Sequence, residues 1–224
     1  MLLRIAIDGP AGAGKSTVAR LVAEKLGYTY IDTGAMYRAL TLAALERGVD
    51  LQDPDALAQT LHAMGLEIRP GAAGNQVFIF GRDVTAKIRS PEVSEHVSLV
   101  SSHAKVRSAV VEMQQKMAKE DNVVMDGRDI GTVVMPDADL KIYLDASVEA
   151  RAERRRLELA RKGFHTPLEE LMTKMRQRDE FDSTREVSPL RQAEDAIVID
   201  TTNLSVREAV DLILDYCRGR GARV

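Results

Sequence analysis

The sequence Gly9-Pro10-Ala11-Gly12-Ala13-Gly14-Lys15-Ser16 fits the pattern G-x-x-x-x-G-K-[ST]. The apolar run at residues 2–7 precedes it and predicts a buried strand, and residues 17–26 follow it and predict a helix. Glycines let the backbone turn so that successive N–H groups point at phosphate oxygens, and the start of the helix adds partial positive charge. The pattern therefore predicts a binding site for a nucleoside triphosphate.

The side chains of this loop have separate expected roles. We expect Lys15 to lie against the β- and γ-phosphates, and the Ser16 hydroxyl to be a ligand of Mg²⁺. The motif does not identify the group that receives a phosphate. The residues predicted to hold ATP are Gly9, Pro10, Ala11, Gly12, Ala13, Gly14, Lys15, Ser16 and Thr17.

Further apolar runs predict strands at residues 28–31, 122–125, 140–144 and 196–199. Helical patterns lie between most of these runs, which predicts a parallel sheet with helices on both faces. Asp residues follow the strands, and ligands of such sheets gather where the strands end. We therefore expect the functional site at this edge of the sheet.

The region of residues 66–84 breaks the alternation of strands and helices. Residues 66–69 and 77–80 are predicted strands, and the Pro- and Gly-containing stretch 70–75 is a predicted turn. The sequence thus predicts a short antiparallel unit inserted into the α/β body.

Two later helices have start signals. Thr166-Pro167-Leu168-Glu169 and Ser205-Val206-Arg207-Glu208 both fit a capping box. After the second signal, one apolar face is predicted from Val206, Ala209, Val210, Ile213, Leu214 and Cys217. The single cysteine, Cys217, cannot form an internal disulfide and is expected to be buried in a protein of a reducing compartment.

Two short segments and a group of arginines suit phosphate binding. Asp32-Thr33-Gly34 is predicted to begin a helix that faces an anion, and Arg38 lies about one turn later. Asp126, at the end of a strand, is typical of a Mg²⁺-supporting carboxylate, and Arg128 follows it. About half of the later arginines are expected to be solvated partners of glutamates, and others to form a lid over ATP. These arginines are Arg151, Arg154, Arg155, Arg156, Arg161, Arg176, Arg178, Arg185 and Arg191.

Composition limits the class of protein. The chain has 224 residues, of which 45% are hydrophobic and 4% aromatic, and its formal net charge is −3. This charge and the few aromatic residues argue against a nucleic-acid-binding protein. No apolar stretch approaches the length of a membrane span, and no signal peptide is visible. We expect a cytoplasmic protein without nucleic-acid or membrane partners, and a monomer because no long apolar stripe is left over.

Four segments together resemble a known family. They are residues 7–17, 32–38, 126–134 and 178–185, and the resemblance extends from Arg4 to about Tyr216. The chain is similar to the bacterial cytidylate kinases, nucleoside monophosphate kinases that form CDP from CMP. The resemblance implies a P-loop kinase fold of the α/β class, with three layers and a five-stranded parallel sheet. It also implies a small inserted α+β part that binds the monophosphate, and a helical lid.

The same resemblance implies one kinase domain over residues 1–224. Its core comprises 1–62, 104–148 and 190–224, its monophosphate-binding insert about 63–103, and its lid about 149–165. Among these residues, it assigns the CMP phosphate to Thr33, Arg38 and Arg128. It assigns the cytosine to Ser98, Arg107, Asp129 and Arg185, and the sugar to Arg178 and Asp182.

Cytosine chemistry agrees with the assignment of Asp129. A carboxylate accepts from the exocyclic amine of cytosine, and guanidinium groups donate to its ring N3 and O2. Uracil has an acceptor in place of the amine, so such a site discriminates strongly against it.

The predicted activity is transfer of the γ-phosphoryl group from ATP to CMP and dCMP. Catalytic roles are expected for Lys15, Arg128, Arg151 and Arg155, and Mg²⁺ is expected at Ser16 and Asp126. The alternatives are another small P-loop kinase, acting on UMP, AMP or a metabolite, and an ATP-dependent switch or nucleic-acid protein.

Overall fold

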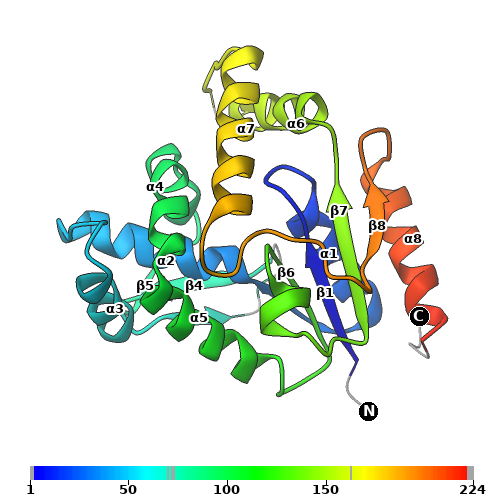
Figure 1. Cartoon of the computed structure of the whole chain (residues 1–224), viewed down its shortest axis with the longest axis horizontal. Helices are drawn as coiled ribbons and strands as arrows, with labels where there is room; N and C mark the ends of the chain where they lie inside the picture. Colours follow the sequence, from blue (N-terminus) through cyan, green and yellow to red (C-terminus); the bar gives the residue numbers. More distant parts are fainter. Residues whose placement is uncertain (1–2, 70, 72–73, 162, 221–224) are drawn as a thin grey trace.

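The computed structural model describes residues 3–69, 71, 74–161 and 163–220. A parallel five-stranded sheet lies at its centre, in the order β2-β6-β1-β7-β8 (Figure 1). The five predicted strands and their parallel arrangement are confirmed; only residue 2 of the first predicted strand lies outside the described residues. The strands are β1 (Arg4–Asp8), β2 (Thr29–Asp32), β6 (Val123–Gly127), β7 (Leu140–Asp145) and β8 (Ile197–Asp200).

Helices cover both faces of this sheet, because successive side chains of a strand point to opposite sides. Ile5 and Ile7 of β1 pack in one cluster with α1 (Lys15–Leu26) and α8 (Val206–Arg218). Ala6 lies between them in the chain and packs in a second cluster, with residues of the π-helical turn η2 (Ile130–Val134) and α5 (Ala104–Met117). The result is the predicted three-layer α/β fold.

A second apolar core joins the inserted region to neighbouring helices. It contains residues of α2 (Thr33–Glu46), α3 (Pro54–Ala63), α4 (Pro91–Ser102) and α5. The inserted sheet packs on it and is antiparallel, as predicted, with the order β3-β4-β5. Of the predicted turn 70–75, residues 70, 72 and 73 lie outside the described part. The remaining elements of this region are β3 (Glu67–Arg69), β4 (Gln76–Ile79), β5 (Arg82–Asp83) and the 3-10 turn η1 (Lys87–Arg89).

The helices α6 (Val148–Arg161) and α7 (Leu168–Thr184) form a hairpin beyond the ends of β1 and β7 (Figure 1). A small apolar cluster that includes Ala152, Leu159 and Leu171 holds them together. No helix in the described ranges is long and apolar enough to cross a membrane.

The two predicted capping boxes have different outcomes. The box of Ser205 and Glu208 forms at α8, but α7 has no side-chain cap, so the prediction at Thr166 and Glu169 was wrong. Pro167 is extended, with ψ 143°, and the helix therefore begins later than the pattern predicted. On α8, Cys217 is buried as predicted, whereas Val206 is 45% exposed because it precedes the part of the helix that reaches the core.

Candidate active site

The predicted phosphate loop connects β1 to α1. Gly9 has a φ of 144°, and a Cβ added there would lie 1.9 Å from the backbone oxygen of Leu144, so only glycine fits. Gly14, with φ 91°, is the N-cap of α1. The Lys15 ammonium group is buried and donates to the carbonyl of Pro10 at 2.7 Å. Burial and the nearby Arg128 lower the pKa of Lys15 well below its ordinary value.

Asp126, at the end of β6, connects this loop to the neighbouring strand. One carboxylate oxygen accepts from the Ser16 hydroxyl at 2.8 Å, and the other from the Tyr30 hydroxyl at 2.8 Å. Burial and the nearby Asp32 raise the pKa of Asp126 to about 6. Asp32 itself caps α2 by accepting from Ala35 N at 3.0 Å. The two predicted metal ligands, Ser16 and Asp126, are thus in direct contact.

The three predicted phosphate-binding residues lie beside this pair. Thr33 is buried, and its hydroxyl donates to the carbonyl of Asp126 at 2.6 Å. Arg38 donates to the Ser94 hydroxyl at 2.9 Å, and Arg128 donates to Asp182 at 2.9 Å. The hydroxyl proton of Thr33 is thus used within the protein in this structure.

These arginines belong to a group of cations that repel one another. Burial and Arg178 lower the pKa of Arg38 to about 10, and burial and Arg128 lower that of Arg178 to about 10. Both Arg128 and Arg178 contribute to the lowered pKa of Lys15. We refer to Lys15, Arg38, Arg128 and Arg178 as the cation cluster. Asp182 lies 3.9 Å from Arg178 as well as contacting Arg128, so one carboxylate faces two of its members.

Three of the four residues predicted to read a base form a second, buried group. Arg107 of α5, 2% exposed, pairs with one oxygen of Asp129 and donates to the carbonyl of Ser101 at 3.1 Å. Arg185 lies 3.9 Å from the other Asp129 oxygen and donates to the carbonyl of Ser188 at 2.7 Å. We refer to Arg107, Asp129 and Arg185 as the carboxylate–arginine cluster.

Some polar atoms of this region are buried but form no hydrogen bond within the described part of the chain. They include Arg107 Nε, Arg185 Nη2 and the hydroxyl of Tyr37. Buried polar groups ordinarily form hydrogen bonds, so unpartnered donors at one place favour a polar ligand. The predicted Ser98 lies on α4, one turn before Ser101, and its carbonyl accepts from the Ser101 hydroxyl at 3.1 Å.

The two predicted lid arginines differ in their surroundings. Arg151 is 3% exposed and donates to the carbonyls of Ala146 at 2.9 Å and Ala11 at 3.1 Å. It also pairs with Asp179 of α7 at 2.7 Å. Arg155 forms an ion pair with Glu158 at 2.7 Å, and its positive charge contributes to the lowered pKa of Arg178. Arg151 therefore holds the phosphate loop and the hairpin together, and Arg155 is the more exposed of the two.

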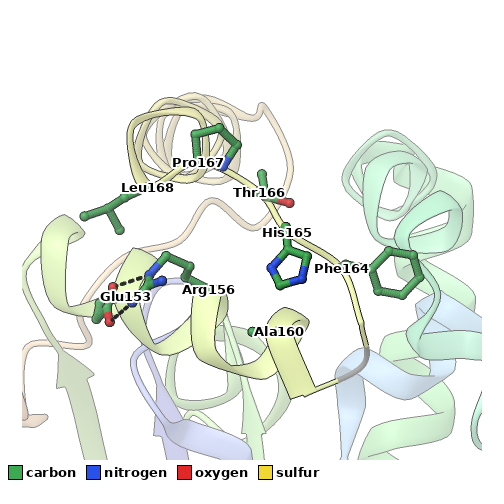
Figure 2. A pocket seen from close by; sticks show the side chains of 8 residues that line it. All are labelled: Glu153, Arg156, Ala160, Phe164, His165, Thr166, Pro167 and Leu168. Atoms are coloured by element: carbon green, nitrogen blue, oxygen red, sulfur yellow. Dashed lines mark hydrogen bonds and ion pairs between the residues drawn. The ribbon is translucent and has the colours of Figure 1, made fainter.

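A hollow at the far end of the hairpin contains none of the predicted site residues (Figure 2). Its wall includes the ion pair of Arg156 with Glu153, at 2.7 Å. The residues that line it are Glu153, Arg156, Ala160, Phe164, His165, Thr166, Pro167 and Leu168. The concentration of buried charge near the strand ends, rather than this hollow, marks the candidate active site.

Sequence analysis missed Tyr30, Asp8 and Asp179 as contributors to this region. Asp8, at the end of β1, accepts from the backbone N–H groups of Ile130 and Gly131, and Tyr30 and Asp179 have the contacts described above. For Asp8 alone, the position at the end of a predicted strand was a usable signal in the sequence. Tyr30 and Asp179 find their partners only through the fold.

Comparisons with known proteins identify the family of the chain. The family model described as cytidylate kinase matches residues 5–219. The cytidylate kinase of Shouchella clausii is 55% identical over 214 residues, which cover 96% of this chain and 95% of that protein. The cytidylate kinase of Bacillus cytotoxicus is 54% identical over 212 residues, 95% of this chain and 94% of that protein.

A solved structure shows the same fold at much lower identity. Shikimate kinase from Acinetobacter baumannii, in complex with shikimate, has a TM-score of 0.50 and 17% identity, with 100% of this chain and 97% of that chain covered. The family model and the close relatives span nearly the whole chain. The chain therefore belongs to the cytidylate kinase family.

Proposed function

We propose that the protein transfers the γ-phosphoryl group of ATP to the phosphate of CMP, forming ADP and CDP, and that it accepts dCMP in the same way. The observation that carries this proposal is the cation cluster, in which Arg128 and Arg178 face the single carboxylate of Asp182. Burial and neighbouring positive charge lower the pKa values of Lys15, Arg38 and Arg178, whereas Asp182 raises that of Arg128. Such an arrangement is unfavourable alone and becomes favourable when anionic phosphates lie among the side chains. The cluster includes Lys15 of the phosphate loop, and its carboxylate partner Asp182 is also influenced by Arg185 of the carboxylate–arginine cluster.

The chemistry of the transfer fits these residues. The attacking oxygen of CMP already belongs to an anion, so the reaction needs no general base. Its main difficulty is the repulsion between two phosphate groups that must come into line. Lys15 binds the β- and γ-phosphates of ATP, Arg38 binds the phosphate of CMP, and Arg128 lies between them. These fixed cations stabilise the charge that spreads over the transferred group.

A magnesium ion is expected with ATP, and the residues suit it. Mg²⁺ prefers oxygen ligands and is usually held by one or two carboxylates or hydroxyls, with substrate phosphates and water. Ser16 and Asp126 supply a hydroxyl and a carboxylate that already lie 2.8 Å apart. When bound, the ion neutralises charge on the β- and γ-phosphates.

Recognition of the base is proposed for the carboxylate–arginine cluster. Asp129 accepts from the exocyclic amine of cytosine, while Arg107 and Arg185 donate to its acceptors. Their unpartnered donors, Arg107 Nε and Arg185 Nη2, support this role. Ser98, on the neighbouring helix α4, completes the proposed base site, and Arg178 and Asp182 contact the sugar.

The hairpin of α6 and α7 supports a lid. We assign Arg155 to the phosphates of ATP, because it lies near Arg178 and is only partly buried. Arg151 acts from the base of the hairpin, where it contacts the phosphate loop through Ala11. Closure of the lid, residues about 149–165, over the core and the insert excludes water and so limits hydrolysis of ATP. A monomer is proposed as the active unit.

An acceptor panel tests the proposal. ADP formation is measured with ATP and Mg²⁺ against CMP, dCMP, UMP, AMP, GMP and no acceptor. We expect CMP and dCMP to exceed every other acceptor by about 100-fold in kcat/KM, which is about 3 kcal/mol. A preference for another monophosphate would leave a kinase but overturn the assignment of the base. Equal ATP consumption with and without any acceptor would overturn the transferase assignment.

A further inference from the structure

Asp8 has an unusual set of partners for a residue at the end of a central strand. It is 4% exposed and lies in register with Gly127 of β6 and Tyr143 of β7. One carboxylate oxygen accepts from the backbone N–H of Ile130 at 2.8 Å, and the other from that of Gly131 at 2.7 Å. Both oxygens of Asp8 therefore bind the first N–H groups of η2.

Those N–H groups belong to the turn that directly follows Asp129. An Asp that precedes a helical turn commonly caps it by accepting from the next free N–H groups with its own side chain. Asp129 makes no such bond, although its carbonyl accepts from Val133 N at 2.9 Å and Val134 N at 3.2 Å. Asp8 caps the turn in its place, and this leaves the carboxylate of Asp129 free to pair with Arg107 and to face Arg185.

The side chains of Asp8 and Lys141 both lie next to Gly131. A Cβ added at Gly131 would lie 3.4 Å from the Asp8 carboxylate, an ordinary contact, and 3.2 Å from the side chain of Lys141, which would have to shift slightly. Burial raises the pKa of Asp8 to about 6, and the bonds from Gly131 and Ile130 oppose that rise, as does Lys15. The group is thus largely ionised at neutral pH, as a double acceptor should be.

From this geometry we infer that Asp8 is a positioning residue for base selectivity: it fixes the backbone after Asp129 and so directs the Asp129 carboxylate toward the base. This inference rests on the proposed function, because it concerns the choice between CMP and other acceptors. It assigns to the strand that leads into the phosphate loop a second role, in reading the acceptor.

The variant Asp8→Asn tests the inference. Its amide keeps one acceptor but turns an N–H group toward a backbone donor, so one of the two bonds is lost and the turn moves. We expect the ratio of kcat/KM for CMP to that for UMP to fall on the order of tenfold, as when a partner that orients a binding side chain is removed. The loss should appear mainly in KM for CMP, with a smaller change in KM for ATP, because Asp8 also lies near Lys15.

Asp139→Asn is the matched control. Asp139 also accepts a backbone bond at β1, from Arg4 N at 2.8 Å, but at the opposite end of the strand. We expect this variant to lose stability in urea unfolding while it keeps the wild-type ratio of CMP to UMP. Equal losses of activity with CMP and UMP in Asp8→Asn, with the ratio unchanged, would overturn the inference and assign Asp8 to the phosphate loop.

Two further variants keep the test decisive. Within an Asp129→Asn background, Asp8→Asn should change the CMP-to-UMP ratio little, because Asp8 acts through Asp129; a second full tenfold loss would contradict this. If Asp8→Asn does not fold, Gly131→Ala places a methyl group against the Asp8 carboxylate and the side chain of Lys141, beside the same N–H group, and should lower the same ratio. The acceptor preference of the wild-type enzyme distinguishes a failure of the proposed function from a failure of the role of Asp8. If it does not prefer CMP, the proposed function fails, whereas a wild-type preference that survives in Asp8→Asn and Gly131→Ala contradicts only the role of Asp8.

Discussion

The charge of Lys15 shows how a single buried side chain is matched to an anion. Its ammonium group has one protein acceptor, the carbonyl of Pro10, and lies near the guanidinium groups of Arg128 and Arg178. Removing water from an ammonium group is costly, and like charges add to that cost. The fold therefore holds Lys15 in a state that a triphosphate would relieve.

Replacing Lys15 by methionine removes the positive charge but keeps much of the volume of the side chain. Methionine is unbranched and apolar, so the buried stem still packs, while the interaction with phosphates is lost. We expect kcat for CMP to fall on the order of 100- to 1,000-fold, with no loss of stability in urea unfolding. Lys25→Met, an exposed position of the same helix, serves as the control. Near-normal turnover in Lys15→Met would contradict the assignment of the phosphate loop.

Asp129 offers a second test at the residue scale. Asp129→Asn replaces one acceptor by an NH₂ donor, which suits the carbonyl of uracil better than the amine of cytosine. We expect the ratio of kcat/KM for CMP to that for UMP to fall on the order of 100-fold. Initial rates with both acceptors measure it, and circular dichroism checks the fold, because Arg107 loses its charged partner. An unchanged ratio would remove Asp129 from the base site.

At the scale of elements, the two predicted capping boxes give a matched pair. At α8 the Ser205 hydroxyl accepts from Glu208 N at 3.3 Å, and Glu208 accepts in return from Ser205 N at 2.8 Å. We expect Ser205→Ala to lower the free energy of unfolding by about 1 kcal/mol. Thr166→Ala, at the box that does not form, should change it by less than about 0.5 kcal/mol. Urea unfolding measures both, and a larger loss at Thr166 would mean that α7 is capped in solution.

The elements that sequence predicts well are those whose pattern is local. An apolar run followed by Asp located β1, β6 and β7, because burial on both faces requires continuous hydrophobic residues. The strand β5, of two residues, has no pattern long enough to detect. The predicted start of α7 was wrong because Thr166-Pro167 fits the capping pattern, whereas Pro167 is extended in the structure and the helix begins at Leu168.

The site shows the same division between local and distant information. The phosphate loop and the Asp126–Asp129 segment are contiguous motifs, so their residues were found from sequence. The hydroxyl of Tyr30 reaches Asp126 only because β2 pairs with β6, and Arg151 reaches Ala11 only because α6 begins above the loop. Such contacts depend on strand order and helix placement, which no local pattern contains.

At the scale of the whole molecule, the sheet brings distant carboxylates to one edge. Asp32 lies in register with Asp126, and Ile7, the neighbour of Asp8, also lies in register with Asp126. One face of the sheet carries an apolar cluster by contrast: α8 packs there against α1, the helix that follows the phosphate loop. Binding of nucleotide at the start of α1 should therefore stabilise the contact with α8 as well.

The reactivity of Cys217 measures whether nucleotide binding at α1 also stabilises α8. The thiol is fully buried, and burial raises its pKa to about 11. Alkylation requires the thiolate, and the thiol of a free cysteine has a pKa of about 8.5. At pH 8 the native thiol should thus be almost entirely protonated, and iodoacetamide should react only with molecules in which α8 has opened.

ATP should slow this alkylation if α8 opens together with the core. A ligand that binds only the folded state at 100 times its Kd adds about 2.7 kcal/mol, which is about a 100-fold reduction in the open population. We expect a slowing of this order at pH 8, measured by mass spectrometry of the alkylated chain. The control is Tyr216→Cys in a Cys217→Ala background, since Tyr216 is 40% exposed and its replacement should react rapidly with or without ATP. Alkylation of Cys217 that is slow but indifferent to ATP would mean that the end of α8 opens alone, without disturbing α1 and the phosphate loop.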